Sequence, residues 1–411
     1  MKLTRYKLGE ILELQRGYDL PSSQMKKGDI LVAGSNGVIG YHNEARSNHP
    51  CITVGRSGSV GKVHYYEQAT WAHNTALFVK DFKGNDPKYL YYFLKNLHLD
   101  KMFDKGSSVV PSLDRKVVHS LNVPCHKDID CQKRIAAILS KIDRKIELNC
   151  AINQNLEAMA KQLYDYWFVQ FDFPNEEGKP YKSSGGKMVW NEKLKREIPE
   201  GWDNCTLEYF LTIKNGRDHK HLAEGLYPVY GSGGEMRRVK ESLYRGESVL
   251  MPRKGTLNNI MYIDEAFWTV DTMFYSEMKI PHCAKYIFFA IKDIDFTRWD
   301  SGTGVPSMTA STLYNLTMIK PNKDLLKRFD KTIAPIFYKM KQIKVECEEL
   351  IKQRNELLPL LMNDQVSVNS DLSVYKKRRG KIPSLTLNHV SDIQILQCKC
   401  IIGIKTVHYT L

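Results

Sequence analysis

Residues 133–168 read KRIAAILSKIDRKIELNCAINQNLEAMAKQLYDYWF, and this stretch decides the fold. When it is written in heptads from Ile135, eight of the ten residues at the first (a) and fourth (d) positions are apolar or aromatic. This spacing is typical of a coiled-coil seam and predicts one long helix. The a positions are Ile135, Ile142, Asn149, Leu156 and Leu163, and the d positions are Ile138, Lys145, Ile152, Met159 and Tyr166.

A second apolar stripe of the same kind lies near the end of the chain. A stripe this long needs a partner. The economical partner is the other helix of the same chain, because two such seams can pair antiparallel and bury each other. The residues predicted to pack are Ile135, Ile142, Leu156 and Leu163 in the first helix and Phe329, Ile336, Ile343, Leu350 and Leu357 in the second, which also carries Ile333, Met340, Cys347 and Leu361 four residues further on.

Three residues interrupt these stripes. Lys145 and Asn149 are the polar interruptions expected of a pin that fixes the helix register, or else they are mismatches that face solvent where the helices splay. Pro335 lies near the start of the second helix. We expect it to bend that helix or to mark its true beginning, because proline removes a backbone hydrogen bond.

The two helices belong to an internal repeat. Gly34–Gly37 (GSNG) matches Gly231–Gly234 (GSGG), which lies 197 residues further on. A fixed displacement of this kind indicates one unit of about 165 residues written twice. Further matches are Arg56-x-Gly58 with Arg253-x-Gly255 and Trp71-x-x-x-Thr75 with Trp268-x-x-x-Thr272 at 197, Ser108–Ser112 with Thr303–Ser307 at 195, and Lys133-Arg134 with Lys327-Arg328 at 194.

Each repeat begins with a glycine-rich α+β segment and ends with a long helix. Short β-branched or aromatic runs separated by Gly, Asn and Pro predict strands, for example 30–32, 51–54, 76–79, 249–251 and 273–278. One short helix is expected in each segment, at 87–96 and 282–291. The predicted domains are 1–125 and 203–321 (two similar mixed domains), 126–170 and 322–362 (two spacer helices forming an antiparallel coiled coil), 171–202 (a Gly-, Pro- and Ser-rich connector) and 363–411 (a tail that the repeat does not explain).

Composition limits the class of protein. With 42% hydrophobic and 26% charged residues, the chain has the balance of an ordinary globular protein. It has neither an apolar run long enough to span a bilayer nor a signal-peptide core, so we expect a cytoplasmic protein without a membrane partner. The nine cysteines are scattered without a C-x-x-C pair, which favours reduced thiols over zinc or disulfides. A net charge of +14 mildly favours a nucleic-acid partner.

Over residues 1 to about 362, the chain resembles the specificity subunits of type I restriction-modification systems. The resemblance rests on the tandem unit, the helix text QKRIAAILSKIDRKIELN ending in LYDYWF, and the connector words FDFP, GKPYKSSGGKMVW and LKREIPEGW. It implies two target-recognition domains, each of which reads half of a bipartite double-stranded DNA site in the major groove. It also implies a helical spacer on which two methyltransferase (modification) subunits dock, joined by restriction (translocase and nuclease) subunits in a bacterial or archaeal cell.

The glycine loops are the candidate DNA-contact segments. Glycine lets backbone amides approach phosphate closely, and the polar and cationic neighbours supply donors for the DNA backbone and base edges. Arg56 and Arg253 share one repeat position and could instead form an internal ion pair. The candidates are Ser35, Asn36, Arg56, Ser57 and Lys62 in the first repeat and Ser232, Arg237, Arg238, Arg253 and Lys254 in the second.

Other motifs are assigned structural roles. We expect Trp71 and Trp268 to be core anchors, because matching aromatics precede a Thr in both copies. The small polar loops carrying Ser107, Ser108, Ser112, Ser301, Thr303 and Ser307 are expected to close turns, although they could hold phosphate.

No chemistry is assigned to this chain itself. Residues 55–63 (GRSGSVGKV) resemble a phosphate-binding loop, but Arg56 and Val63 depart from its pattern. A nucleotide hydrolase therefore remains an alternative, as does a coiled-coil adaptor without sequence preference. The chain shows no adenine-methylation tetrapeptide and no convincing nuclease cluster. We therefore expect no metal or cofactor here, and the resemblance assigns S-adenosylmethionine, ATP and magnesium to the partner subunits.

Overall fold

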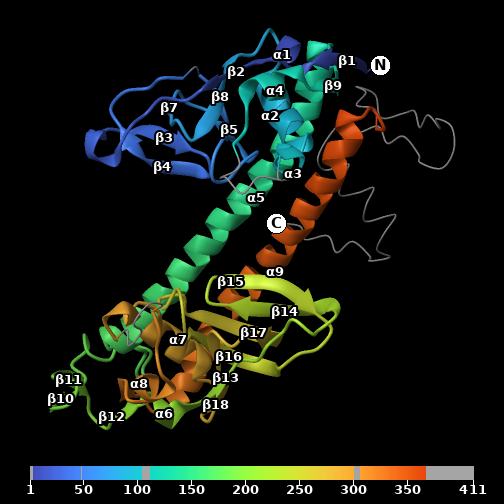
Figure 1. Cartoon of the computed structure of the whole chain (residues 1–411). Helices are drawn as coiled ribbons and strands as arrows, with labels where there is room; N and C mark the ends of the chain where they lie inside the picture. Colours follow the sequence, from blue (N-terminus) through green and yellow to red (C-terminus); the bar gives the residue numbers. More distant parts are fainter. Residues whose placement is uncertain (1–2, 48, 104–111, 300–305, 367–411) are drawn as a thin grey trace, which may run out of the picture. The chain divides into compact units, whose positions relative to one another are not determined.

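The computed structural model describes residues 3–47, 49–103, 112–299 and 306–366. Its internal contacts divide the chain into two compact units. Unit 1 comprises Met1–Cys150 together with Val345–Leu411, and unit 2 comprises Ala151–Lys344. Each unit contains its own sheets, its own short helices and a segment of both long helices, α5 (Ile129–Tyr164) and α9 (Lys323–Met362) (Figure 1).

Unit 1 is built on two small sheets with the strand orders β2-β8-β5-β6 and β4-β3-β7, beside a separate β1-β9 pair. The runs expected at 30–32, 51–54 and 76–79 are confirmed as strands, and α2 spans the predicted residues, with Asp86 accepting the Tyr89 N–H as its N-terminal cap. Its elements are β1 (Thr4–Lys7), α1 (Leu8–Ile11), β2 (Glu13–Arg16), β3 (Ile30–Gly34), β4 (Gly37–His42), β5 (Cys51–Gly55), β6 (Val63–Tyr66), β7 (Trp71–Ala72), β8 (Ala76–Asp81), α2 (Pro87–Asn96), α3 (Leu99–Phe103), α4 (Arg115–Ser120) and β9 (Asn122–Cys125), with a 3-10 turn at Ser22–Gln24.

Unit 2 repeats this plan in one six-stranded sheet with the order β13-β18-β16-β17-β14-β15 and a separate β12-β19 pair. The strands at 249–251 and 273–278 are confirmed, and α7 takes the place of the expected helix. Its elements are β10 (Met188–Asn191), β11 (Arg196–Pro199), β12 (Asp203–Thr206), α6 (Leu207–Phe210), β13 (Leu211–Asn215), β14 (Glu224–Gly231), β15 (Gly234–Val239), β16 (Tyr244–Pro252), β17 (Met261–Thr269), β18 (Met273–Met278), α7 (Ala284–Lys292), α8 (Ala310–Tyr314) and β19 (Thr317–Lys320), with a 3-10 turn at Phe296–Trp299.

The two units share one topology. Strand β3 pairs in parallel with β7 through Val32 and Trp71, and β14 pairs in parallel with β17 through Val229 and Trp268. The difference is that β17 is one continuous strand, whereas β6 and β7 cover the same part of unit 1 as two strands. The prediction of one short helix in each segment was too low, because α1, α3 and α4 in unit 1 and α6 and α8 in unit 2 are additional. The α+β prediction is confirmed.

The long helices are α5 (Ile129–Tyr164) and α9 (Lys323–Met362). The Asn322 side chain accepts the Leu325 N–H at 2.7 Å, which caps the start of α9. The helix then continues without a break through Pro335, whose ring lies on its exposed side. The expectation that Pro335 marks the beginning of this helix is therefore wrong, because a cap 13 residues earlier fixes the start.

Segments of α5 and α9 pair antiparallel inside each unit. In unit 1, Arg354 Nη1 donates to Asp143 Oδ1 at 2.8 Å. The Glu346 carboxylate forms an ion pair with Lys145 Nζ at 2.5 Å and accepts a hydrogen bond from Asn149 Nδ2 at 2.9 Å. In unit 2, Asn153 Nδ2 donates to the Met340 carbonyl at 3.2 Å. Lys145 and Asn149 therefore contact the opposing helix, as a register pin does, rather than facing solvent as a mismatch.

The seam of α5 differs from the predicted a/d pattern. Ile152, Met159 and Tyr166 are exposed by 44%, 52% and 37%, so their placement on the seam is wrong. A straight helix has 3.6 residues per turn and drifts about 20° per heptad from a strict seven-residue repeat, so the buried face moves away from the d positions. The buried or half-buried residues lie four positions after each a residue, at Leu139, Ile146, Asn153, Ala160 and Trp167.

The remaining predicted packing residues are placed as follows. Ile135, Ile142, Leu350 and Leu357 are buried in the core of unit 1. Phe329 and Ile343 are buried in unit 2, where Leu163 and Ile336 pack partly buried against the core and Leu156 is half-buried.

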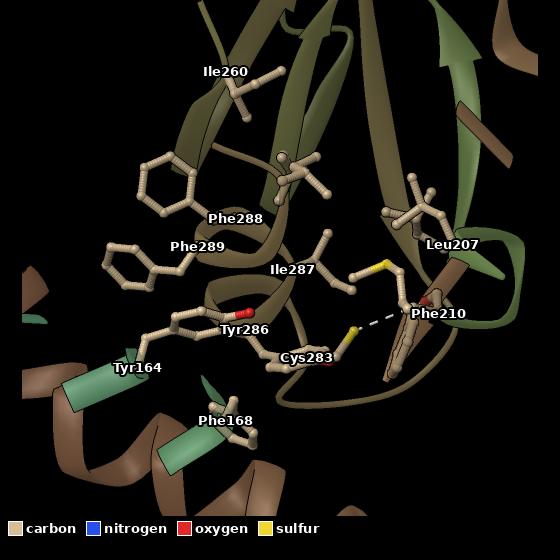
Figure 2. Packing of buried hydrophobic residues seen from close by; sticks show 14 of the residues in the cluster. Tyr164, Phe168, Leu207, Phe210, Ile260, Cys283, Tyr286, Ile287, Phe288 and Phe289 are labelled. Carbon is tan, nitrogen blue, oxygen red and sulfur yellow. Dashed lines mark hydrogen bonds between the residues drawn. The ribbon is translucent and has the colours of Figure 1, made fainter. Parts of the chain in front are cut away.

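The core of unit 2 encloses the end of α5 and the π-helical turn that follows it, Asp165–Val169. Tyr164 and Phe168 pack against Tyr286 and Phe289 of α7, with ring centroids 4.8 to 5.9 Å apart (Figure 2). Residues 171–202 also belong to this core through Phe171, Phe173, Ile198 and Trp202. The connector is thus a packed segment carrying the β10–β11 hairpin, because its aromatic residues anchor the glycine- and proline-rich stretches between them.

The core of unit 1 encloses the end of α9 in the same manner. Leu350, Leu357, Leu358 and Leu361 are buried with residues of α1, α2 and the first half of α5. The Leu361 carbonyl lies 3.3 Å from Nε2 of the buried His126. Each unit therefore completes its core with the C-terminal end of a long helix from the other repeat.

Candidate nucleic-acid interface

In unit 1 the candidate residues gather around Thr75. The Ser35 N–H donates to Thr75 Oγ1 at 3.3 Å, and the N–H groups of Arg56 and Ser57 donate to the Thr75 carbonyl at 2.8 and 3.1 Å. The side chain of Lys62 donates to Asn36 Oδ1 at 2.8 Å. The turn after β3 and the loop after β5 are thereby held together, and all five predicted residues share one surface region.

Glycine permits this close approach. A Cβ on Gly55 would lie 2.8 Å from the Ser35 carbonyl and closer still to the carbonyl of Ser59. Gly37, which ends the turn, has a φ of 107°. These two positions exclude larger residues, so the glycines bring the two loops into contact.

The charge of this region comes from Arg56 and Lys62. Burial, assisted by the nearby Lys62 and Lys95, lowers the pKa of His64 below its ordinary value. His64 is therefore neutral at pH 7. Arg56 is half-buried and donates from Nη1 to the Asn74 carbonyl at 3.3 Å, so its guanidinium contacts backbone rather than the internal ion pair that was the alternative.

Unit 2 builds the same arrangement around Thr272. The N–H groups of Arg253 and Lys254 donate to the Thr272 carbonyl at 2.8 and 3.2 Å. Asn259 Nδ2 donates to the Ser232 carbonyl at 2.9 Å, which again joins the turn to the neighbouring loop. Ser232, Arg253 and Lys254 are thus brought together as their counterparts are in unit 1.

Arg237 and Arg238 lie further along β15, outside this cluster. Arg237 Nη2 donates to the Leu222 carbonyl at 2.7 Å, and Arg238 Nε donates to Glu235 Oε1 at 2.9 Å. Arg237 is therefore oriented toward the loop before β14, while Arg238 is an exposed residue on the strand at the edge of the sheet.

The sequence did not identify Thr75 and Thr272 as organising residues. Their backbone carbonyls and the Thr75 hydroxyl fix the loops on which the candidates lie. The signal was present in the repeated Trp-x-x-x-Thr pattern. Both tryptophans of that pattern are buried, with Trp71 Nε1 donating to the Tyr18 carbonyl and Trp268 Nε1 to the Arg217 carbonyl, which confirms the prediction of core anchors.

Of the small polar loops, Ser112 and Ser307 are described. Ser112 forms an isolated bridge with Ser57, and Ser307 forms one with Lys254. Both serines therefore lie beside the candidate loops. Ser107, Ser108, Ser301 and Thr303 lie outside the described residues, as does the segment 367–411.

Residues 55–63 do not form a phosphate-binding loop. They join β5 to β6 as a hairpin, with the Gly55 N–H donating to the Lys62 carbonyl at 2.7 Å. A phosphate-binding loop needs a helix directly after its Lys, so that the helix N-terminus faces the phosphates. Lys62 is followed by a strand, and the nucleotide-hydrolase alternative is therefore wrong at this position.

Each unit also carries a cavity against its long helices. In unit 1 a cavity of about 940 Å³ is lined by Tyr65, Lys88, Tyr91 and Asp143, with Arg354 from the opposing helix. In unit 2 a cavity of about 870 Å³ is lined by the repeat counterparts Tyr262, Lys285, Phe288 and Phe337, with Asn153 and Glu157 from the opposing helix.

Within the described part of the chain, His, Cys, Asp and Glu form no group suited to hold a metal ion. The cysteines described there are all free thiols. Among the described helices, none combines the length and the apolar character that crossing a bilayer requires.

Comparisons with known proteins agree on one family. Residues 2–158 match the family model of the type I restriction modification DNA specificity domain. This part of the chain therefore carries that domain, and the chain is similar to the specificity subunits of type I restriction-modification systems. Specificity subunits are the non-catalytic DNA-recognition components of those systems.

Individual relatives agree with this assignment. The MjaIX specificity subunit of Methanocaldococcus jannaschii is 25% identical over 68% of this chain and 69% of its own length. The HindI specificity subunit of Haemophilus influenzae is 21% identical over 68% of this chain and 77% of its own. The crystal structure of an S subunit from M. genitalium covers 88% of this chain and 96% of its own, with a TM-score of 0.55 and 18% identity, and shows a shared fold.

Proposed function

We propose that units 1 and 2 each read one half of a bipartite, asymmetric DNA site and so direct methyltransferase and ATP-dependent restriction subunits to it. The observation that carries this proposal is the repetition of the Thr75 cluster as the Thr272 cluster. In each unit the Thr carbonyl accepts two consecutive backbone N–H groups, those of Arg56 and Ser57 in unit 1 and of Arg253 and Lys254 in unit 2. Two equivalent surfaces in one chain suit a site with two half-sites. Phosphate contacts position a protein on DNA, whereas contacts to base edges specify the sequence.

The two surfaces differ in their side chains, which supports an asymmetric site. Asn36 of unit 1 corresponds to Gly233 of unit 2, and Lys62 corresponds to Asn259. An Asn side chain offers the paired donor and acceptor that recognise adenine, whereas glycine offers only backbone. Two surfaces that share one backbone arrangement but carry different side chains recognise different bases.

Two methyltransferase subunits are proposed as partners, one for each unit. The two cavities support this stoichiometry, because their lining residues occupy corresponding positions of the repeat. Two copies of one partner protein can therefore each meet a cavity at the corresponding position of the repeat. S-adenosylmethionine is assigned to the methyltransferases and ATP with magnesium to the restriction subunits, and the complex acts on DNA in the cytoplasm.

Methylome sequencing tests the reading function. Co-expression of the chain with its methyltransferase should create one new methyl-adenine motif that is split into two unlike halves. Asn36→Ala should relax one half only, and Asn259→Ala should relax the other half only, because each changes one surface. The absence of a new motif would refute the proposal, and DNA retention without sequence preference would favour the coiled-coil adaptor.

Filling the cavities tests the partner stoichiometry. Ser140 and Ala334 are small residues at corresponding positions of the two cavity linings. Ser140→Trp and Ala334→Trp should each remove one methyltransferase subunit in native mass spectrometry, and the double variant should remove both. Ala137→Trp and Lys331→Trp are matched controls on exposed positions of the same helices. Two bound subunits in the double variant would contradict docking at the cavities.

A further inference from the structure

The hairpins that carry the two candidate surfaces are bulged at the same place. In the β3–β4 hairpin, Ala33 pairs with Val38 and Val32 pairs with Gly40, so that Ile39 has no partner in the ladder. In the β14–β15 hairpin, Tyr230 pairs with Glu235 and Val229 pairs with Arg237, so that Met236 has none. Ile39 and Met236 lie at the repeat displacement of 197. Each hairpin thus places an apolar residue at its bulge.

Both bulge residues are exposed. Ile39 is 49% and Met236 59% exposed. Each side chain lies over the glycine that precedes the turn, because a Cβ on Gly34 would come within 2.9 Å of Ile39 Cγ2 and a Cβ on Gly231 within 2.6 Å of Met236 Sδ. The glycines leave room for these side chains at the hairpin tip, beside Ser35 and Ser232.

Single exposed apolar residues are common on protein surfaces and need no function. These two differ from such residues in three respects: they recur at one repeat position, each occupies a bulge, and each adjoins a candidate DNA-contact turn. A bulge twists the strand locally and re-aims a side chain, and bulges are enriched next to functional sites. Neither side chain owes its apolar character to a place in a hydrophobic core, because both are exposed to solvent.

The chemistry of DNA defines what an exposed apolar side chain can read. The major groove is wide enough to admit a two-stranded β-ribbon. Its base edges present hydrogen-bond donors and acceptors, and thymine adds the C5-methyl group, against which apolar side chains pack. Asn36 with Lys62 in unit 1, and Lys254 in unit 2, provide polar and cationic groups beside the same turns for phosphate and base edges.

We propose that Ile39 and Met236 each contact the C5-methyl group of a thymine in the major groove and thereby fix a thymine in each half of the recognised site. This inference rests on the proposed function. The two residues read the methyl group differently, because Ile is branched at Cβ and stiff, whereas Met is unbranched and adapts its shape. Unit 1 is accordingly the more selective reader of the two at this position.

Replacing thymine by uracil tests the contact, since uracil keeps the base pair and lacks the methyl group. The probe is the assembled complex of the chain with its methyltransferase, on duplexes in which each thymine of the methylated motif is replaced in turn. Fluorescence anisotropy should show one sensitive thymine in each half, with binding about three- to tenfold weaker, as expected for one buried methyl group.

The variants assign each thymine to its reader. Ile39→Ala should abolish the uracil effect in one half of the site, and Met236→Ala should abolish it in the other half. Ile152→Ala, an exposed isoleucine on α5 with 44% exposure, should leave both effects unchanged. Circular dichroism of each variant verifies that the fold is retained.

The outcomes separate the two proposals. A wild-type complex that methylates no split motif refutes the proposed function itself. If the motif is split, but either half lacks a thymine or no uracil changes binding by more than twofold, the methyl contact is refuted. An equal uracil effect in Ile39→Ala and in the wild type also refutes it for unit 1, and the same comparison for Met236→Ala decides unit 2.

Discussion

At the residue scale, the two units fill one structural position with opposite chemistry. In unit 1, Asp143 accepts hydrogen bonds from Tyr92 Oη at 2.6 Å and from Arg354 Nη1 at 2.8 Å. The corresponding residues of unit 2 include Phe289 and Phe337, whose ring centroids are 6.0 Å apart. Unit 1 thus uses a charged network where unit 2 uses aromatic packing. A network of this kind stabilises only while every member keeps its partner.

Removing the arginine of that network should destabilise unit 1. Arg354→Ala leaves the largely buried Asp143 without its cation, and we expect a loss of about 2–4 kcal/mol in the free energy of unfolding. Arg144→Ala is the matched control, because Arg144 is 68% exposed in its pair with Glu147 and should cost less than about 0.5 kcal/mol. Urea denaturation measures both, and equal losses would show that the network does not stabilise unit 1.

The buried thiol of Cys283 predicts a pH dependence. Burial is the main cause that raises its pKa to about 12, from 9.0 for an ordinary thiol. The folded state therefore holds this proton more tightly, so the stabilisation is complete below pH 9.0 and is lost as the pH rises toward 12. Between pH 9 and 11, the free energy of unfolding measured by urea denaturation should fall by up to about 1.4 kcal/mol per pH unit. Cys283→Ala should remove this part of the pH dependence. An unchanged slope in the variant would contradict the assignment.

At the element scale, the helices show how far pattern reasoning reaches. Residue spacing located the main strands, α2, α7 and the two long helices, and the repeat matched the glycine loops of the two copies to each other. It did not place the turn after β3 beside the loop after β5. The last three d positions, Ile152, Met159 and Tyr166, were wrong because periodicity fixes a face only within the drift between 3.5 and 3.6 residues per turn. The bulges at Ile39 and Met236 left no recognisable pattern in either copy, since one extra residue shifts the alternation that would reveal the strand.

Two leucines on α5 test the corrected seam. Leu139 is fully buried, whereas Leu148 is 46% exposed on the same helix and in the same unit. Leu139→Ala should cost about 2–5 kcal/mol through lost burial and the cavity left behind. Leu148→Ala should change the free energy of unfolding by about 0.5 kcal/mol or less. Chemical denaturation of the two variants measures both losses. A larger loss of free energy of unfolding for Leu148→Ala would mean that the face with Leu148, and not the face with Leu139, forms the seam.

Pro335 offers a stabilising change in α9. Proline in a helix interior lacks the N–H that bonds one turn back and clashes with the preceding turn, at a cost of about 3 kcal/mol. Because Pro335 is exposed, Pro335→Ala removes that cost without opening a cavity. We expect unit 2 to gain about 1–3 kcal/mol, measured as a higher thermal midpoint. A lower midpoint would mean that the helix needs the distortion.

At the scale of the whole molecule, each unit depends on residues from both repeats. Leu350, Leu357, Leu358 and Leu361 come from the second repeat and are buried in the core of unit 1. Likewise Tyr164 and Phe168, from the first repeat, are buried in the core of unit 2. Sequence reasoning assigned one target-recognition domain to each repeat. It did not predict this exchange, because an apolar stripe identifies the buried face of a helix but not the domain against which each turn packs.

Truncation after Lys344 should therefore unfold unit 1 and spare unit 2. Each buried leucine removed is worth about 2–5 kcal/mol, so the loss of four, about 8–20 kcal/mol, is as large as the total stability of a typical domain, about 5–15 kcal/mol. Hydrogen exchange should show rapid labelling of β5 and β8 with β16 and β18 still protected. Truncation after Val366 is the control, since it keeps every core residue that the structure describes. Protection of β5 in the shorter chain would contradict this account.

The division of the chain also sets the order in which the units can mature on the ribosome. Met1–Cys150 is synthesised first, but the leucines that complete its core belong to Val345–Leu411. Unit 1 therefore cannot finish folding until the last segment of the chain has been made. All of Ala151–Lys344 has been made before those leucines emerge. A nascent chain therefore exposes the incomplete apolar surface of unit 1 throughout most of its synthesis, and this is the interval in which chaperones would bind it.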